Sequence, residues 1–242
     1  MNELAELTIK AHGGLKRWGQ FESVSAHLDQ GGALWALKGQ AGTLDHTNVT
    51  AGLRSEWASH APFGPSGARS RFEPHRVALE SPAGEVLEEL REPRASFAGH
   101  TLETPWSTLQ LAYFVGCAMW TYLNTPFLLA HPGVASEELS PWEENGETWR
   151  RLRVSFPDDI ATHSSVQTLY IDGDGLLKRH DYDVEIAGNT PGAHFIDEYK
   201  DVAGIMFPTK RRIFPRQADG TARPEPLVVS IDLSDIALKS VW

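Results

Sequence analysis

Cysteine and long apolar runs are both scarce in this chain of 242 residues. The one cysteine, Cys117, cannot form an intrachain disulfide, and a thiol in an apolar stretch is usually inert. The longest apolar stretch, from Leu109 to Leu123, is shorter than the roughly 20 residues that cross a bilayer. We therefore expect neither a disulfide scaffold, nor a cysteine nucleophile, nor membrane insertion.

Positive charge is also in short supply. The formal net charge is −10, and the densest basic run is only Lys210-Arg211-Arg212. Because nucleic-acid binding needs clustered Lys and Arg to neutralise phosphates, we expect no nucleic-acid partner. The amino terminus has early acidic residues and no apolar run, unlike a signal peptide. Together with the single cysteine, this predicts a cytoplasmic protein.

Several motifs that bring chemistry with them are missing. The sequence has no glycine-rich phosphate loop, no Gly-x-Ser-x-Gly elbow and no dinucleotide fingerprint. We therefore expect no cofactor and no serine-hydrolase mechanism of that fold. Hydrophobic residues make up 41% and charged residues 22%, as in an ordinary globular protein, and no repeat or long linker divides the chain. We predict a single domain over residues 1–242.

Short strand patterns dominate what is present. A helix is predicted from residue 2 to about 18, interrupted or ended by Gly13-Gly14. From Phe21 onward, alternating segments separated by turn residues indicate strands. The predicted strands before the central helix are 23–28, 33–40, 42–50, 53–61, 71–81 with an edge or bulge at Pro74, and 85–93. Those after it are 148–156, 166–171, 176–186, 193–202, 205–216 and 226–238.

One helix, over residues 107–124, departs from this β pattern. Ser107 is a good N-cap, Pro126 prevents continuation, and the helix is apolar on all sides. A helix of this kind is buried on every face. Residues 131–148 look like a loop. We predict an α+β fold, mostly antiparallel β, in which a single curved sheet wraps around the buried central helix and begins with an amino-terminal helix.

The segment "THSSVQTLYIDGDGLLKRHDY", residues 162–182, predicts a hairpin with unusual polar residues inside. Alternation puts His180 and Tyr182 on the apolar face, and Arg179, Asp181 and Asp183 on the other. Counting back through the turn places Gln167 opposite His180, Ser165 opposite Tyr182 and His163 near Val184, within hydrogen-bond reach. The hairpin therefore predicts a cluster on one inner surface: His163, Ser165, Gln167, His180 and Tyr182.

Buried polar side chains cost about 1–3 kcal/mol each when unpartnered, so these five must satisfy one another, bind water or face a cavity. A structural network that fixes strand register explains them as well as a ligand-binding or catalytic face does. A metal site from His163, His180 and His194 is less favoured, since no tight histidine spacing supports it. We predict no metal.

Five further residues are candidates for the walls of a binding site. Arg211 and Arg212 straddle a strand, so one of them should point inward, where Arg211 could bind a carboxylate or phosphate; pairing with Asp197 or Glu198 is the simpler role. His194 lies on the strand after the hairpin. Trp106, Trp120 and Tyr122 are expected to line or fill the cavity.

The pattern as a whole resembles the LolA-like proteins. The resemblance rests on an amino-terminal helix ending near "AHGG", a meander of strands, a helical insertion and the late strand pair "VAGIMFPTKRR". It extends to a cytoplasmic bacterial branch of that superfamily carrying "FPDDIATHSSVQ" and "RHDY". The resemblance implies an unclosed β half-barrel with an apolar concave cavity, which lipoprotein carriers use for acyl chains. Lacking a signal peptide pattern, this chain departs from those carriers.

Three functional hypotheses follow. The first is binding of a small apolar or amphipathic molecule, oriented by the polar cluster and by Ser165, Gln167, His194 and Arg211. The second is a cofactor-independent isomerase, lyase or cyclase, with His163 or His180 as acid or base and Tyr182 as a hydrogen-bond donor to an oxyanion. The third, a chaperone for an apolar peptide or lipid tail, needs a wide groove.

Overall fold

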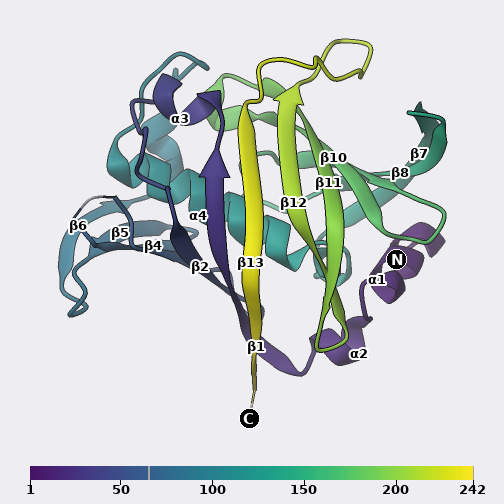
Figure 1. The fold of residues 1–242 in the computed structure, drawn as a ribbon, viewed down its shortest axis with the longest axis horizontal. Coiled ribbons are helices and arrows are strands. Elements are labelled where there is room, and N and C mark those ends of the chain that lie inside the picture. The colour runs from purple at the N-terminus through teal and green to yellow at the C-terminus, as the bar shows by residue number, and fades with distance from the viewer. Residues whose placement is uncertain (65, 242) are drawn as a thin grey trace.

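The computed structural model describes residues 1–64 and 66–241, and in these ranges a single antiparallel sheet of 13 strands organises the chain (Figure 1). The first six strands are β1 (Phe21–Gly31), β2 (Thr47–Gly52), β3 (Ala58–Ala61), β4 (Arg69–Glu73), β5 (Arg76–Glu80) and β6 (Val86–Arg91). The other seven are β7 (Ala135–Glu144), β8 (Glu147–Ser155), β9 (Val166–Ile171), β10 (Leu177–Val184), β11 (Thr190–Val202), β12 (Ile205–Pro215) and β13 (Val229–Ser240).

The order of the strands joins two meanders at the centre of the sheet. The sheet runs β6-β5-β4-β3-β2-β1-β13-β12-β11-β10-β9-β8-β7, so β1 and β13 pair in the middle while β6 and β7 form the two edges. The helix α4 (Thr108–Asn124) connects these edges through the concavity and packs against β2 to β5 (Figure 1). This confirms the predicted single curved sheet around a central helix.

The ends and burial of α4 follow from its sequence. Ser107 and Gln110 form a reciprocal capping box, with Gln110 N–H donating to Ser107 Oγ at 3.2 Å and Ser107 N–H to Gln110 Oε1 at 2.9 Å. The helix stops at Asn124, two residues before Pro126, and every residue from Leu111 to Asn124 is buried. Among the described residues, no helix has the length and apolar character needed to span a membrane.

The predicted amino-terminal helix is divided into α1 (Glu3–Ala11) and α2 (Leu15–Trp18). Gly13 between them has φ +116° and lies so close to Gly204 that an added Cβ would be 2.2 Å from its carbonyl oxygen. Only glycine combines this backbone conformation with so close an approach. The two helices therefore fold against the β11–β12 turn instead of continuing as one rod.

A short helix replaces the strand expected over residues 33–40. The structure has α3 (Ala33–Leu37), which begins after Gly32 at φ +108° and buries Leu34 and Trp35. Strand β1 ends at Gly31, and the alanine and leucine residues that follow have high helix propensity. The apolar residues of this segment therefore form the buried face of a helix and not a strand. The strand prediction was wrong at this point.

The segment expected to be a loop, residues 131–148, contains the edge strand β7. β7 pairs on one side only, with β8; most of its side chains are exposed, and four of its ten residues are glutamates. Edge strands carry charge because it discourages pairing with other chains, and this removes the alternation by which strands are recognised. Short 3₁₀ helices lie at Pro93–Phe97, Phe127–Ala130 and Glu185–Ala187.

Three other boundaries differ from the predictions. Pro74 lies in the turn between β4 and β5, so residues 71–81 form parts of two strands and not one bulged strand. The segments 42–50 and 53–61 become β2 and β3 only in their second halves. Pro74 lacks a backbone N–H, which suits a turn better than a ladder.

The β9–β10 hairpin has a register two residues from the predicted one. His180 pairs with Leu169 and Tyr182 with Gln167, and a bulge lies between Leu177 and Arg179. A shift of two keeps each side chain on its predicted face, because side chains alternate with a period of two. The inner cluster therefore survives an incorrect register.

Candidate functional site

A cavity of about 350 Å³ lies between α4 and the carboxyl-terminal half of the sheet. Its inner region is walled by apolar side chains of α4 and of β12 and β13, and its rim is exposed at Leu37, Pro191, Arg223 and Pro226. The rim belongs to α3, the start of β11 and the β12–β13 connection. Cavities of this size and character are typical of small-molecule sites, which span about 300–1,000 Å³.

Helical spacing explains how α4 contributes a wall. The cavity-lining residues of α4 are Phe114, Val115, Ala118, Met119 and Tyr122. These positions follow the spacing of three and four residues that places side chains on one face of a helix. The opposite face carries Gly116, where an added Cβ would lie 2.3 Å from Phe72 Cβ of β4. A helix that is apolar all round can thus pack on one side and line a cavity on the other.

Two tyrosines separate this cavity from a buried polar cluster. Tyr122 and Tyr182 both line the cavity, and their hydroxyl groups hydrogen-bond to each other at 2.7 Å. Behind them lie three of the predicted polar residues, His163, Gln167 and His180, and two neighbours from later strands. The buried cluster comprises Tyr122, His163, Gln167, His180, Tyr182, His194 and Arg211.

The contacts of this cluster form a chain with a defined direction. Arg211 can only donate, so the Nη1 contact to His194 Nε2 at 3.4 Å places the proton of His194 on Nδ1. His194 Nδ1–H then donates to the Tyr182 hydroxyl at 3.3 Å, Tyr182 to Tyr122, and Tyr122 to His163 Nε2 at 3.0 Å. His163 Nδ1–H ends the chain without a partner among the described residues.

Gln167 orients the remaining imidazole. Its side-chain nitrogen donates a hydrogen bond to the Ser164 carbonyl at 2.8 Å, and its Oε1 accepts one from His180 Nε2–H at 2.5 Å. The two residues are diagonal neighbours across β9 and β10. This is the interaction predicted from the sequence, reached through the shifted register.

Burial keeps the three imidazoles neutral. Desolvation lowers the pKa of His163 to about 3, with the nearby Arg94 charge adding to the effect. Desolvation likewise lowers the pKa values of His180 and His194 well below the ordinary value for histidine. The hydroxyl pKa values of Tyr122 and Tyr182 are raised for the same reason. Arg211 is therefore the one charged member of the cluster, and the imidazole, amide and phenol groups are neutral.

The structure places the predicted site residues in three groups. His163, Gln167, His180, Tyr182, Tyr122, His194 and Arg211 meet in the cluster, and Trp106 lines the cavity with the two tyrosines. Of the cluster, only Tyr122 and Tyr182 line the cavity within the described residues, so the imidazoles lie behind its wall. The arginine that points inward is Arg211, while Arg212 pairs with Asp232 at 2.8 Å.

Two predicted site residues lie elsewhere. Ser165 is exposed and donates through its hydroxyl to Glu185 at 2.6 Å, because it precedes β9, which begins at Val166, and strand alternation does not extend to it. Trp120 points to the other side of α4, where it lines a separate hollow and donates to the Gly52 carbonyl at 2.9 Å. Their assignment to the cavity was wrong.

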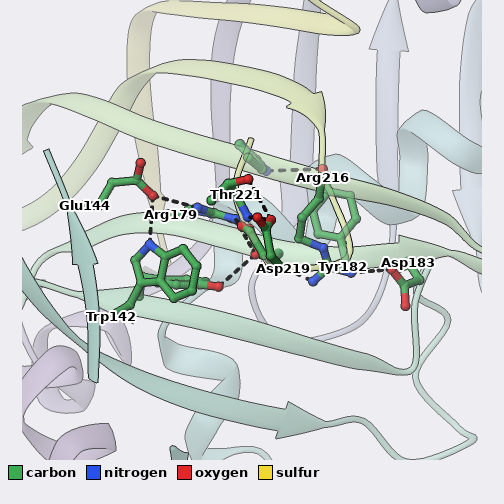
Figure 2. A network of polar contacts seen from close by, with 12 residues as sticks. Trp142, Glu144, Arg179, Tyr182, Asp183, Arg216, Asp219 and Thr221 are labelled. Carbon is green, nitrogen blue, oxygen red and sulfur yellow. Dashed lines mark hydrogen bonds and ion pairs between the residues drawn. The ribbon is translucent and has the colours of Figure 1, made fainter. Parts of the chain in front are cut away.

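The outer face of β10 holds a network that alternation did not reveal (Figure 2). Arg179 and Asp181 are buried there, with Arg179 Nε donating to Asp181 Oδ1 at 2.7 Å. Arg179 also donates to Glu144 of β7 at 2.7 Å and to the Gly220 carbonyl at 2.5 Å. Alternation makes residues 179, 181 and 183 look like a solvated face, but only Asp183 is exposed, while Arg179 is buried by partners 35 or more residues away in the sequence.

In the part of the chain that the structure describes, the one group of side chains placed to share a metal ion lies on the outer surface. His27, Asp29 and His46 offer ligand atoms within 4.8 Å of one another. His46 Nδ1 lies 2.6 Å from Asp29 Oδ1, and both side chains are more than half exposed. Two imidazoles and a carboxylate suit a divalent transition metal, but the direct His46–Asp29 contact already satisfies this pair.

Solved structures share this architecture. A LolA superfamily protein from Nitrosomonas europaea superimposes with a TM-score of 0.54 at 10% identity, covering 98% of this chain and 94% of that one. A DUF1329 family protein from Desulfovibrio piger also gives a TM-score of 0.54, at 11% identity, covering 99% of this chain and 93% of that one. No family model matches the sequence, and no curated protein matches it either. The chain has the LolA-like half-barrel fold.

Proposed function

We propose that this protein binds one small, largely apolar molecule in the cavity between α4 and the sheet. The observation that carries the proposal is a cavity of about 350 Å³ whose inner wall is almost entirely aliphatic and aromatic. Filling such a space with an apolar ligand gains about 25 cal/mol for each Å² removed from water. The half-barrel fold supports the proposal, since the resemblance implies an apolar concave cavity.

The polar cluster fits a supporting role in this function. Tyr122 and Tyr182 are the two cluster residues that line the cavity, and each hydroxyl is already held by the donor chain from Arg211. Each phenol oxygen keeps a lone pair for a further hydrogen bond. We infer that the network fixes these two rings and thereby the shape of the cavity wall.

The acid–base alternative receives less support. An isomerase, lyase or cyclase of the predicted kind needs His163 or His180 to exchange a proton with the ligand near neutral pH. Their pKa values are strongly lowered by burial, and the two tyrosines stand between these imidazoles and the cavity. The proton-transfer role stays a prediction, for which loss of turnover in His180→Ala would be the test.

Blocking the cavity tests the binding proposal. Ala118 lines it from α4, so a phenyl ring in Ala118→Phe should occupy the space of the ligand. We expect affinity for the neutral fluorescent probe N-phenylnaphthylamine to fall at least about tenfold, equivalent to about 1.4 kcal/mol. Ala36→Phe adds the same ring on the exposed outside of α3 and serves as the matched control. Equal probe affinities in both variants would refute the proposal.

A cytoplasmic location also stays a prediction. It rests on the single cysteine, Cys117, which is buried and needs no oxidising compartment. Fractionation of the source cells, with detection of the chain in the soluble interior or outside it, tests this prediction directly.

A further inference from the structure

The charged residue in the described lining of the cavity is positive, although the chain as a whole is negative. The protein has a formal net charge of −10, yet of the described residues that line the cavity Arg223 alone is charged. Arg223 is exposed at the rim. Within the described chain its guanidinium forms neither an ion pair nor a side-chain hydrogen bond.

Two more cations lie directly behind the aromatic wall. Lys38 Nζ is 4.5 Å from the centre of the Trp106 ring, and the Arg211 guanidinium carbon is 5.1 Å from the centre of the Tyr122 ring. Both side chains are buried. Neither pairs with a carboxylate in the region of the chain that the structure describes. Lys38 instead donates to the carbonyls of Thr101, Leu102 and Thr104 at 2.6–3.1 Å.

The segment that carries Arg223 is held in place beside the cavity. The backbone N–H of Arg223 donates to the Pro215 carbonyl at 2.9 Å, and the backbones of Arg216 and Ala222 form an isolated antiparallel β-bridge. On the outer side, the buried Arg179 binds the Gly220 carbonyl and Trp142 covers Gly220 (Figure 2). The rim is thus a fixed turn, and Arg223 is presented at a defined position.

Arg223 is the one charged side chain of the described lining, and no acidic residue of that lining offsets it, so the cavity presents positive charge to a ligand at its rim. Charges interact strongly across a low-dielectric interior, because aromatic rings screen them much less than water does. A neutral ligand would gain nothing from this arrangement and a cation would be repelled. An anion would be attracted, and at the rim it could also bind the Arg223 guanidinium by charge-assisted hydrogen bonds.

We propose that the ligand is an amphipathic anion, whose alkyl part fills the cavity and whose negatively charged head binds at Arg223. This inference rests on the proposed function and adds the chemical class of the ligand. It assigns Arg223 as the residue that positions the head group. Lys38 and Arg211 contribute from behind the wall without touching the ligand.

Three probes built on a ten-carbon chain, with different heads, test the charge. Decanoate, decanol and decyltrimethylammonium compete with N-phenylnaphthylamine for the intact protein, and fluorescence gives each dissociation constant. We expect decanoate to bind at least about tenfold more tightly than decanol, and decyltrimethylammonium to bind most weakly. Added salt should weaken decanoate binding selectively.

Variants of Arg223 test the position of the head. Arg223→Gln should lower the ratio of decanoate to decanol affinity about fivefold, and Arg223→Lys should restore most of it. Arg153→Gln is the matched control, because Arg153 is an exposed arginine of β8 outside the cavity. Its ratio should stay within about twofold of the parent protein.

The possible outcomes distinguish a failure of anion selectivity from a failure of apolar ligand binding itself. If neither N-phenylnaphthylamine nor any decyl compound binds, the proposed function fails and the inference falls with it. If decanol or decyltrimethylammonium binds as tightly as decanoate, the cavity binds apolar molecules and the inference alone is overturned. A decanoate preference that survives Arg223→Gln overturns the position assigned to the head.

Discussion

Arg211 shows how a single side chain can connect a helix end to a buried cluster. The carbonyl of Tyr122 would bond to the N–H of residue 126 in a continuing helix, but Pro126 has none. Arg211 Nη2 donates to this carbonyl at 3.2 Å. The carboxyl end of a helix carries a partial negative charge, so the end of α4 compensates the buried guanidinium where no carboxylate of the described chain does.

Removing this side chain should therefore destabilise the protein. Arg211→Ala leaves the Tyr122 carbonyl buried without a partner and opens a hole beside His194, at a cost of roughly 2–4 kcal/mol. Arg212→Ala removes a partly exposed pair with Asp232 and should cost less than about 1 kcal/mol. Urea unfolding followed by tryptophan fluorescence measures both. Similar losses for the two neighbours would contradict this account of Arg211.

At the scale of elements, α4 must approach the sheet more closely than most helices can. Gly116 faces Phe72 of β4 so directly that an added Cβ would be 2.3 Å from Phe72 Cβ. On the opposite side of α4, Val115, Ala118 and Met119 line the cavity. The position of α4, and with it the width of the cavity, depends on one missing methyl group.

A methyl group at that point should be costly. We expect Gly116→Ala to lower the free energy of unfolding by about 2–3 kcal/mol, because overpacking outweighs the helix propensity that alanine adds. Gly173→Ala, at a turn where no atom lies within 4 Å of the added Cβ, is the control and should be nearly neutral. Thermal unfolding monitored by circular dichroism compares them. A neutral Gly116→Ala would mean that α4 can move away from β4.

The network on β10 is a second feature of element scale. Arg179 and Glu144 connect β7 to the centre of the outer face, and the Gly220 carbonyl brings the β12–β13 connection to the same place (Figure 2). A buried ion pair of this kind adds little net stability against an apolar replacement but is costly to break. Its contribution here is position: it fixes the segment that bears Arg223.

At the scale of the whole molecule, burial of neutral histidines sets the response to acid. The buried histidines with lowered pKa values are His12, His60, His163, His180 and His194. In each case desolvation is the main cause, and the lowered pKa of His12 is about 4. The unfolded chain takes up protons near pH 6.5 while the folded protein does not.

Stability should therefore fall steeply with acid. These folded pKa values lie below the unfolded one, so the contribution is complete above pH 6.5 and is lost as the pH falls toward the folded values. Well below pH 6.5, each of these histidines lowers the free energy of unfolding by about 1.4 kcal/mol per pH unit, down to its folded pKa. We expect unfolding between about pH 4 and 5, measured by circular dichroism across a pH series. His180→Gln should flatten the dependence and the exposed His131→Gln should not; equal slopes would count against this.

How far the sequence predicts this structure depends on the range of the interaction. The cap at Ser107, the end of α4 before Pro126 and the inner face of β10 depend on neighbours a few residues apart, and all three were predicted correctly. The edge strand β7 and the helix α3 were not, because tertiary position overrides local pattern at a sheet edge and at a strand end. Trp120 was misplaced because an all-apolar helix does not reveal which side faces the cavity.

The sequence by itself determined the classes of element, the burial of α4 and the presence of imidazole, amide and phenol groups on one inner face, because periodicity and capping act within a few residues. Only the tertiary structure decided that the imidazoles lie behind Tyr122 and Tyr182, that Arg179 is buried, and that Lys38, Arg211 and Arg223 surround one cavity. These arrangements join residues far apart in the chain. The contacts that stabilise them are between residues distant in sequence, so local sequence patterns do not predict them.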